Sequence, residues 1–206
     1  MVGLTIFPED CDQTPADKFT RGSSMKISRL TSMVFIAVFA ALIAVCSQIQ
    51  IPSVVPFTLQ TFAVFLAVGL LGGKRGTVSV LIYILLGAVG LPVFAGFKGG
   101  IGALLGTTGG YIIGFIFSAL IMWGFEKIPG KKIPILTLSM IAGLIVCYAF
   151  GTAWFITVYT NTKEPVGVAT ALSWCVFPFI IPDLIKIALA LFLTGRLKKF
   201  MPEGIR

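Results

Sequence analysis

Histidine is absent from this chain of 206 residues, and acidic side chains are few. The missing imidazole excludes histidine metal sites, histidine-based catalytic pairs and histidine proton relays. The cysteines, at positions 11, 46, 147 and 175, form no close C-x-x-C pair, so the sequence supports neither a zinc site nor a disulfide framework. A phosphate-binding G-x-x-x-x-G-K-[ST] motif is also missing, which argues against ATP binding by this chain.

Hydrophobic residues, in contrast, make up 57% of the chain, and its mean hydropathy is +1.00. This composition is typical of a polytopic membrane protein. At roughly 20 residues for each span, the length allows about six membrane helices. We therefore predict an all-α fold with six transmembrane helices, at residues 30–49, 57–71, 77–90, 107–125, 133–159 and 171–195.

The basic residues predict the orientation of these helices, because cytoplasmic loops of membrane proteins are enriched in Lys and Arg. They gather before the first span, between spans 2 and 3, between spans 4 and 5, and after span 6. The alternate connections hold only Lys98 and Lys163. Both termini are therefore predicted to be cytoplasmic. The net charge of +8 follows from this pattern, so we predict no nucleic-acid partner.

Residues 1–24 differ from the rest of the chain, because they hold half of its eight acidic residues. Met25 then precedes two basic residues and the first apolar run. We predict that residues 1–24 are a leader or an extension outside the fold, and that residues 25–206 form the six-helix membrane domain.

Asp183 and Lys186 are the only charged residues in the apolar run 174–194. Each would cost roughly 2.5–3.5 kcal/mol at the centre of a membrane helix, so an ionisable residue there predicts a functional role. Their spacing places both on one face of a helix. We expect Pro182 at the first helical position, which would place Asp183 near the positive end of the helix dipole. The alternative is a structural ion pair without a ligand.

Two connections on the predicted outer side favour a lid over a pocket. Residues 48–61 combine prolines with amides and hydroxyls and carry no charge, while residues 91–111 are rich in glycine and carry only Lys98. Glycine lets the main chain come close to a ligand. Irregular backbone at membrane depth is tolerated only inside protein or against a cavity.

Several motifs follow one another in a specific order: Pro56-Phe-Thr-Leu-Gln60-Thr-Phe, Leu-Leu-Gly72-Gly-Lys-Arg-Gly76, Tyr83-x-x-x-Gly87-x-x-Gly90-Leu-Pro-Val-Phe94, Gly106-Thr-Thr-Gly-Gly-Tyr111-x-x-Gly114-Phe and Pro182-Asp183-Leu-Ile-Lys186. Together they resemble the BioY family, the biotin-specific S components of energy-coupling factor (ECF) transporters. The resemblance covers residues 25–199. Thr107 stands where the family pattern has proline.

The resemblance implies a protein with the S-component fold in a bacterial cell membrane. Such a protein captures biotin at the outer face with high affinity. The resemblance also implies a separate module, formed by a transmembrane coupling protein and two cytoplasmic ATPases, and neither an enzymatic activity nor a cofactor of the chain itself. An S component for another small vitamin is one alternative. An intramembrane enzyme and a simple channel or assembly protein are alternatives of other classes.

Biotin presents three chemical surfaces, and the chain offers a partner for each. Lys186 is predicted to hold the carboxylate, with Lys98 as a second partner or a solvated loop residue. Asp183 and Gln60 are predicted to pair with the ureido ring. The aromatic wall for the thioether ring would come from Tyr83, Tyr111 and Trp154, of which Trp154 has the alternative of an interfacial anchor.

The remaining predicted residues are small or hydroxylated. Thr58, Gly100 and Gly110 complete the predicted binding set. Ala37, Ala41 and Ala44 form a pattern of small residues in the first span that lets helices approach closely in lipid. The resemblance implies that this face docks the coupling protein, and packing within the chain is the alternative.

Overall fold

Helices make up nearly all of the structure, a computed structural model that describes residues 15–53, 55–129, 132–162 and 165–201. Among these residues the elements are α1 (Pro15–Gln48), β1 (Gln50–Ile51), β2 (Phe57–Thr58), α2 (Gln60–Leu71), α3 (Gly73–Ala88), α4 (Ile101–Leu105), α5 (Gly109–Glu126), α6 (Lys132–Thr162), α7 (Val168–Cys175) and α8 (Phe177–Leu197). The strands form one short antiparallel ribbon, in which Gln50 pairs with Thr58 and Ile51 with Phe57.

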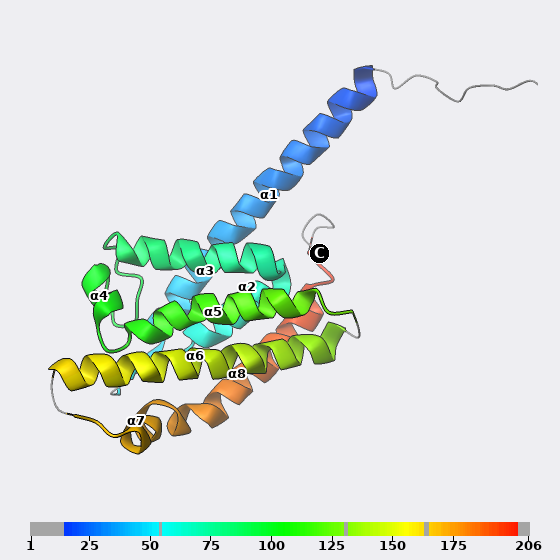
Figure 1. Ribbon diagram of the computed structural model, residues 1–206. Coiled ribbons are helices and arrows are strands. Elements are labelled where there is room, and N and C mark those ends of the chain that lie inside the picture. Colours follow the sequence, from blue (N-terminus) through cyan, green and yellow to red (C-terminus); the bar gives the residue numbers. More distant parts are fainter. Residues whose placement is uncertain (1–14, 54, 130–131, 163–164, 202–206) are drawn as a thin grey trace, which may run out of the picture.

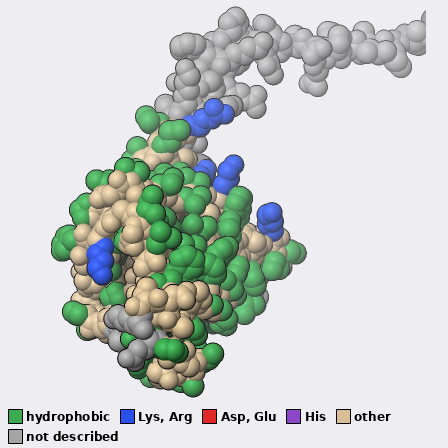
Figure 2. All heavy atoms as spheres, turned by 60° about the vertical axis from the view of Figure 1, so that its left-hand side comes forward, with side chains coloured by type: hydrophobic (Ala, Val, Ile, Leu, Met, Phe, Trp, Pro, Cys, Tyr) green, Lys and Arg blue, Asp and Glu red, His purple; other side chains and the backbone are tan. Residues whose placement is uncertain are grey.

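Four stretches of the described chain are long and apolar enough to cross a membrane: Arg29–Gln48, Gly109–Glu126, Ile133–Thr162 and Val168–Leu197. The two predicted spans at 57–71 and 77–90 correspond to the shorter helices α2 and α3, of 12 and 16 residues. The chain is therefore mainly helical, with the long helices of a membrane protein, and the count of six spans stays a prediction. Figure 2 shows how hydrophobic side chains spread over one flank of the bundle.

Helix α2 is the centre of the fold. It packs against α1, α3, α5 and α8, and eleven of its residues are buried: Gln60, Thr61, Ala63, Val64, Phe65, Leu66, Ala67, Val68, Gly69, Leu70 and Leu71. A helix that is apolar on all sides is stable only when other helices surround it. At 1.5 Å per residue, α2 is about 18 Å long, well short of the roughly 30 Å hydrocarbon core.

Helix α1 lies at the edge of the bundle, and its first part projects beyond the other helices (Figure 1). It begins at Pro15, so residues 15–24 of the predicted extension are helical and continuous with α1. Residues 1–14 lie outside the described residues. The predicted division at residue 24 stays a prediction.

The turn between α2 and α3 depends on close helix packing. Gly72 has φ +79°, a conformation that favours glycine. A Cβ atom at Gly73 would lie 2.5 Å from the Cα of Trp123, so α3 begins in direct contact with the backbone of α5. The main-chain N–H of Gly73 also donates to Oε2 of Glu126, 2.7 Å away, at the end of α5.

The predicted span 171–195 is not one helix, because the structure divides it at Val176 into α7 and α8. Pro178 lies in the first turn of α8, where its missing N–H costs no helical hydrogen bond. The predicted place of Pro182 at the first helical position is therefore wrong, since Pro182 lies inside α8. Asp183 accordingly lies in the second turn rather than at the positive end of the helix.

Candidate functional site

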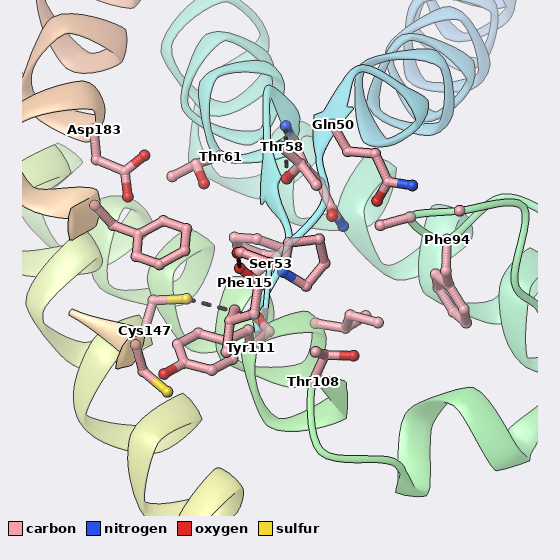
Figure 3. Close-up of a pocket in the computed structure, with 18 of the residues that line it drawn as sticks. Gln50, Ser53, Thr58, Thr61, Phe94, Thr108, Tyr111, Phe115, Cys147 and Asp183 are labelled. Carbon is pink, nitrogen blue, oxygen red and sulfur yellow. Dashed lines mark hydrogen bonds between the residues drawn. The ribbon is translucent and has the colours of Figure 1, made fainter. Parts of the chain in front are cut away.

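A cavity of about 300 Å³ opens above the N-terminal end of α2. It is lined by residues from both predicted outer connections, including Gln50, Ser53, Phe94 and Lys98. Helices α5, α6 and α8 close the other side, where Figure 3 shows Tyr111, Cys147 and Asp183 around the same space as Thr61 of α2. The segments predicted to form a lid thus meet the charged face of α8 at one cavity.

The two charges in the last helix form a buried ion pair that lines this cavity. Lys186 Nζ lies 2.6 Å from Asp183 Oδ1, and the two residues are 5% and 2% exposed. The same ammonium donates to the main-chain oxygen of Thr58 at 2.7 Å and lies 3.9 Å from the ring centroid of Phe57. An ammonium has three donors, and the oxygens of Asp183 and Thr58 accept from two of them, so one N–H of Lys186 can donate to a ligand.

Tyr148 of α6 holds the second oxygen of this carboxylate. Its hydroxyl donates to Oδ2 of Asp183 at 2.5 Å, and its side chain lines the cavity. No sequence pattern predicted Tyr148 at the site, because Tyr148 and Asp183 are 35 positions apart and belong to no common motif. The only signal in the sequence is a tyrosine within an apolar span, and a hydroxyl in such a place needs a partner.

Gln60, at the first position of α2, lines the cavity, and a hydrogen bond to a buried residue holds its side-chain amide in place. Its Nε2 donates to the hydroxyl of Tyr83 at 2.8 Å. Tyr83 is fully buried and lies outside the cavity lining, with its ring edge against Phe94. Because this bond fixes the amide, Tyr83 orients Gln60 rather than forming the predicted aromatic wall.

Of the other predicted residues, Tyr111 and Thr58 line the cavity. Tyr111 shares a hydrogen bond of 3.0 Å with the hydroxyl of Thr152, which fixes the ring between α5 and α6. The aromatic surface of the cavity also includes Phe94, Phe115 and Phe179, which were not predicted from the sequence.

Besides Tyr83, three predicted residues lie outside the lining and have packing or turn contacts instead. Trp154 donates from Nε1 to the main-chain oxygen of Gly106 at 3.1 Å. Gly110 lies against it, since a Cβ atom there would come within 2.2 Å of the Trp154 Cβ. Gly100 precedes α4 with φ +86°, and its N–H donates to the oxygen of Gly87 at 2.7 Å.

The loop that carries Lys98 is fastened to the end of α1 by one side chain. Nε2 of Gln48 donates to the main-chain oxygen of Phe94 at 3.1 Å, and Oε1 of Gln48 accepts from the N–H of Phe97 at 3.0 Å. The main-chain N–H of Phe94 donates to the oxygen of Lys98, and the N–H of Lys98 donates to the oxygen of Phe94. This tight turn holds an exposed Lys98 at the rim of the cavity.

The site has the donors and acceptors for an organic molecule rather than a metal. Within the described ranges, no group of three His, Cys, Asp or Glu side chains is placed to hold a metal ion. The lining combines one carboxylate, two ammonium groups, amides, hydroxyls and aromatic rings. A small polar molecule with an apolar part fits this combination.

The chain is similar to known proteins over most of its length. Residues 19–203 match the BioY family. The chain belongs to the BioY family. "Biotin transporter BioY" of Thermotoga maritima is 43% identical over 167 residues, which cover 81% of this chain and 95% of that protein. "Probable biotin transporter BioY" of Pyrococcus horikoshii is 43% identical over 164 residues, which cover 79% of this chain and 93% of the relative.

A solved structure has the same fold as this BioY family member. The crystal structure of "the S-component for biotin from an ECF-type ABC transporter" superposes with a TM-score of 0.73 at 28% sequence identity. The match covers 83% of this chain and 92% of that chain. BioY is a transport family rather than an enzyme family, and the predicted membership is confirmed.

Proposed function

We propose that this chain is the high-affinity biotin-binding subunit of an ATP-driven vitamin uptake transporter. It captures biotin at the outer face of a bacterial plasma membrane and delivers it through a separate coupling protein with two ATPase subunits. The observation that carries the proposal is the buried Asp183–Lys186 pair in the cavity of a BioY family member. The names of the relatives and of the similar structure support biotin as the ligand.

The charge balance of the cavity favours one orientation of biotin. Asp183 already neutralises Lys186, so a carboxylate placed against this pair would bring an uncompensated negative charge into a buried site. The ureido ring is neutral and carries both N–H donors and a carbonyl acceptor. It matches the remaining acceptor capacity of Asp183 and the remaining donor of Lys186.

Lys98 then provides the cation for the carboxylate of biotin. Among the described charged residues of the lining, it is the one outside the Asp183–Lys186 pair, and no salt bridge within the described chain neutralises it. Its place at the rim also leaves the charged end of the ligand nearest to solvent. The contact between Lys186 and the carboxylate, predicted from the sequence, is the opposite orientation of the same ligand.

Biotin and biotin methyl ester distinguish the two orientations, because the ester lacks the negative charge. Native mass spectrometry and titration calorimetry would measure both ligands on the wild type, Lys98→Gln and Lys186→Gln. We expect Lys98→Gln to weaken biotin and leave the ester unchanged, whereas Lys186→Gln weakens both equally. The reverse pattern would assign the carboxylate to Lys186, and no binding of either ligand to the wild type would refute the proposed function.

The face of α1 that carries the predicted alanines is accessible to a partner within the membrane. Ala37 and Ala41 are exposed, and Ala44 is half-buried. They lie beside the exposed Val34, Val38 and Val45, so alanine and valine side chains form a continuous apolar strip on α1. We propose that this strip docks the coupling protein, because small side chains allow two helices to approach closely in lipid.

A further inference from the structure

A second cavity, of about 490 Å³, lies at the opposite end of α2 from the proposed biotin site. Leu70 and Leu71 at the end of α2 contribute to it, whereas Gln60 and Thr61 at the start of α2 line the first cavity. The walls come from α1, the end of α2, the first turns of α3, the end of α5 and the residue after α8. Nothing in the proposed binding of biotin uses this space.

Basic side chains from three separate segments converge on this second cavity. Its cationic residues are Arg29, Lys74, Arg75 and Lys198, of which Arg75 and Lys198 are half-buried. Four cations and the single carboxylate of Glu126 leave a net charge of +3 among the described lining residues.

Glu126 does not compensate the whole cluster, because its one carboxylate faces four cations. Its Oε2 accepts the hydrogen bond from the N–H of Gly73 at 2.7 Å, at the first turn of α3. The carboxylate therefore stabilises the positive end of that helix. The remaining basic groups form an electropositive pocket that suits an anion.

The other wall of the second cavity is apolar and continues onto the lipid-facing side of α1. Met33, Ile36 and Val78 line the cavity together with Leu70 and Leu71. Met33 is 65% exposed, and its neighbour Val34 is 53% exposed. An occupant must therefore combine a negative group with an apolar part at the edge of the membrane.

We propose that the second cavity binds the phosphate headgroup of an anionic phospholipid from the leaflet at this end of the molecule. The phosphate lies among the basic side chains, and the glycerol and first acyl carbons pack against Met33 and Ile36. Basic pockets between membrane helices bind lipid headgroups in this way. This site is independent of biotin and would exist even if the ligand of the first cavity were a different vitamin.

The test uses the full chain in detergent and measures bound phosphatidylglycerol by native mass spectrometry, with phosphatidylcholine as the neutral comparison. The variant Lys74→Gln/Lys198→Gln removes two cations from the cavity. Lys127→Gln/Arg196→Gln is the matched control, because these residues lie within two positions of the lining residues Glu126 and Lys198 but outside the lining. Each cation near a membrane surface contributes about fivefold in affinity, so the cavity variant should bind phosphatidylglycerol about 25-fold more weakly.

We expect the control variant to bind phosphatidylglycerol like the wild type and both variants to retain biotin binding, which shows that they fold. Equal binding of phosphatidylcholine and phosphatidylglycerol to the wild type would overturn the proposal. Equal losses in the two variants would overturn it as well, because the effect would then follow net charge rather than the cavity. Displacement of the lipid by excess glycerol phosphate would assign the site to a soluble phosphate and refute the lipid.

Discussion

Lys186 and Asp183 occupy adjacent turns of α8 and share one buried hydrogen bond, at 2.6 Å. Both side chains are more than nine-tenths buried, so their attraction offsets a large desolvation cost. Such a pair can stabilise the fold, bind a ligand or do both. The two roles are separable, because removing one charge and removing both charges have different effects on the free energy of unfolding.

We expect Lys186→Met to destabilise the protein by about 3–5 kcal/mol, because Asp183 would remain buried without a counter-charge. The double variant Asp183→Asn/Lys186→Met should recover most of this loss while still failing to bind biotin. Thermal unfolding in detergent and biotin titration would measure the two effects. Biotin binding by the double variant at wild-type affinity would show that the pair is structural only.

Tyr148→Phe should weaken biotin binding while the protein stays folded. The ring remains in place, but Oδ2 of Asp183 loses the hydroxyl that fixes it. The loss of a hydrogen bond to a charged group costs about 1.5–3 kcal/mol, which is roughly 10- to 150-fold in affinity. Titration calorimetry measures the change.

The matched control for this variant is Tyr159→Phe, on the same helix but outside the cavity lining. It should bind biotin like the wild type. A similar loss of affinity in both variants would mean that tyrosine hydroxyls on α6 act through helix stability rather than through Asp183.

Gly110→Ala should lower the thermal stability of the protein, because the added methyl group would meet the Trp154 side chain at 2.2 Å. Overpacking of this kind costs about 1–3 kcal/mol. Gly124→Ala, on the same helix, has nothing within 4 Å of the new Cβ and should stabilise α5 by about 0.5–1 kcal/mol. Differential scanning fluorimetry would compare the two, and equal melting temperatures would contradict the packing role of Gly110.

Ala41→Trp should leave biotin binding unchanged and abolish uptake in cells that contain the whole transporter. Ala41 is exposed on α1 and does not line the biotin cavity, so the large ring would act only on a partner. The control is Leu189→Trp on α8, which is 47% exposed on another helix. Uptake at the wild-type rate in the Ala41 variant would contradict docking through this strip.

The sequence predicted the main features of the site because charges are rare in membrane spans. Asp183 and Lys186 stand out in their apolar run, and both line the cavity together with the predicted outer connections. Gln60, Thr58 and Tyr111, which the family motifs contain, line the same cavity. Such features can be predicted from local composition or from the order of motifs.

The features that the sequence did not predict depend on contacts between distant segments. Tyr148 reaches Asp183 only because α6 and α8 lie side by side. Trp154 and Gly110 belong to conspicuous residue types, but the packing of α5 on α6 uses them for helix contact instead of the cavity. The division at Val176 was not predicted, because Pro178 and Pro182 are both possible starts for the last helix and only Pro178 lies at its start.

The short helix α2 has one cavity at each of its ends, and its length therefore affects the electric field between the two cavities. The 12 residues of α2 span about 18 Å, so the two cavities are separated along this helix by roughly three fifths of a hydrocarbon core of about 30 Å. Where both hollows are hydrated, the membrane voltage falls over that shorter distance and the local field is correspondingly steeper. The Asp183–Lys186 pair carries no net charge. This field therefore exerts a torque on the pair but no net force that would move it from one cavity toward the other.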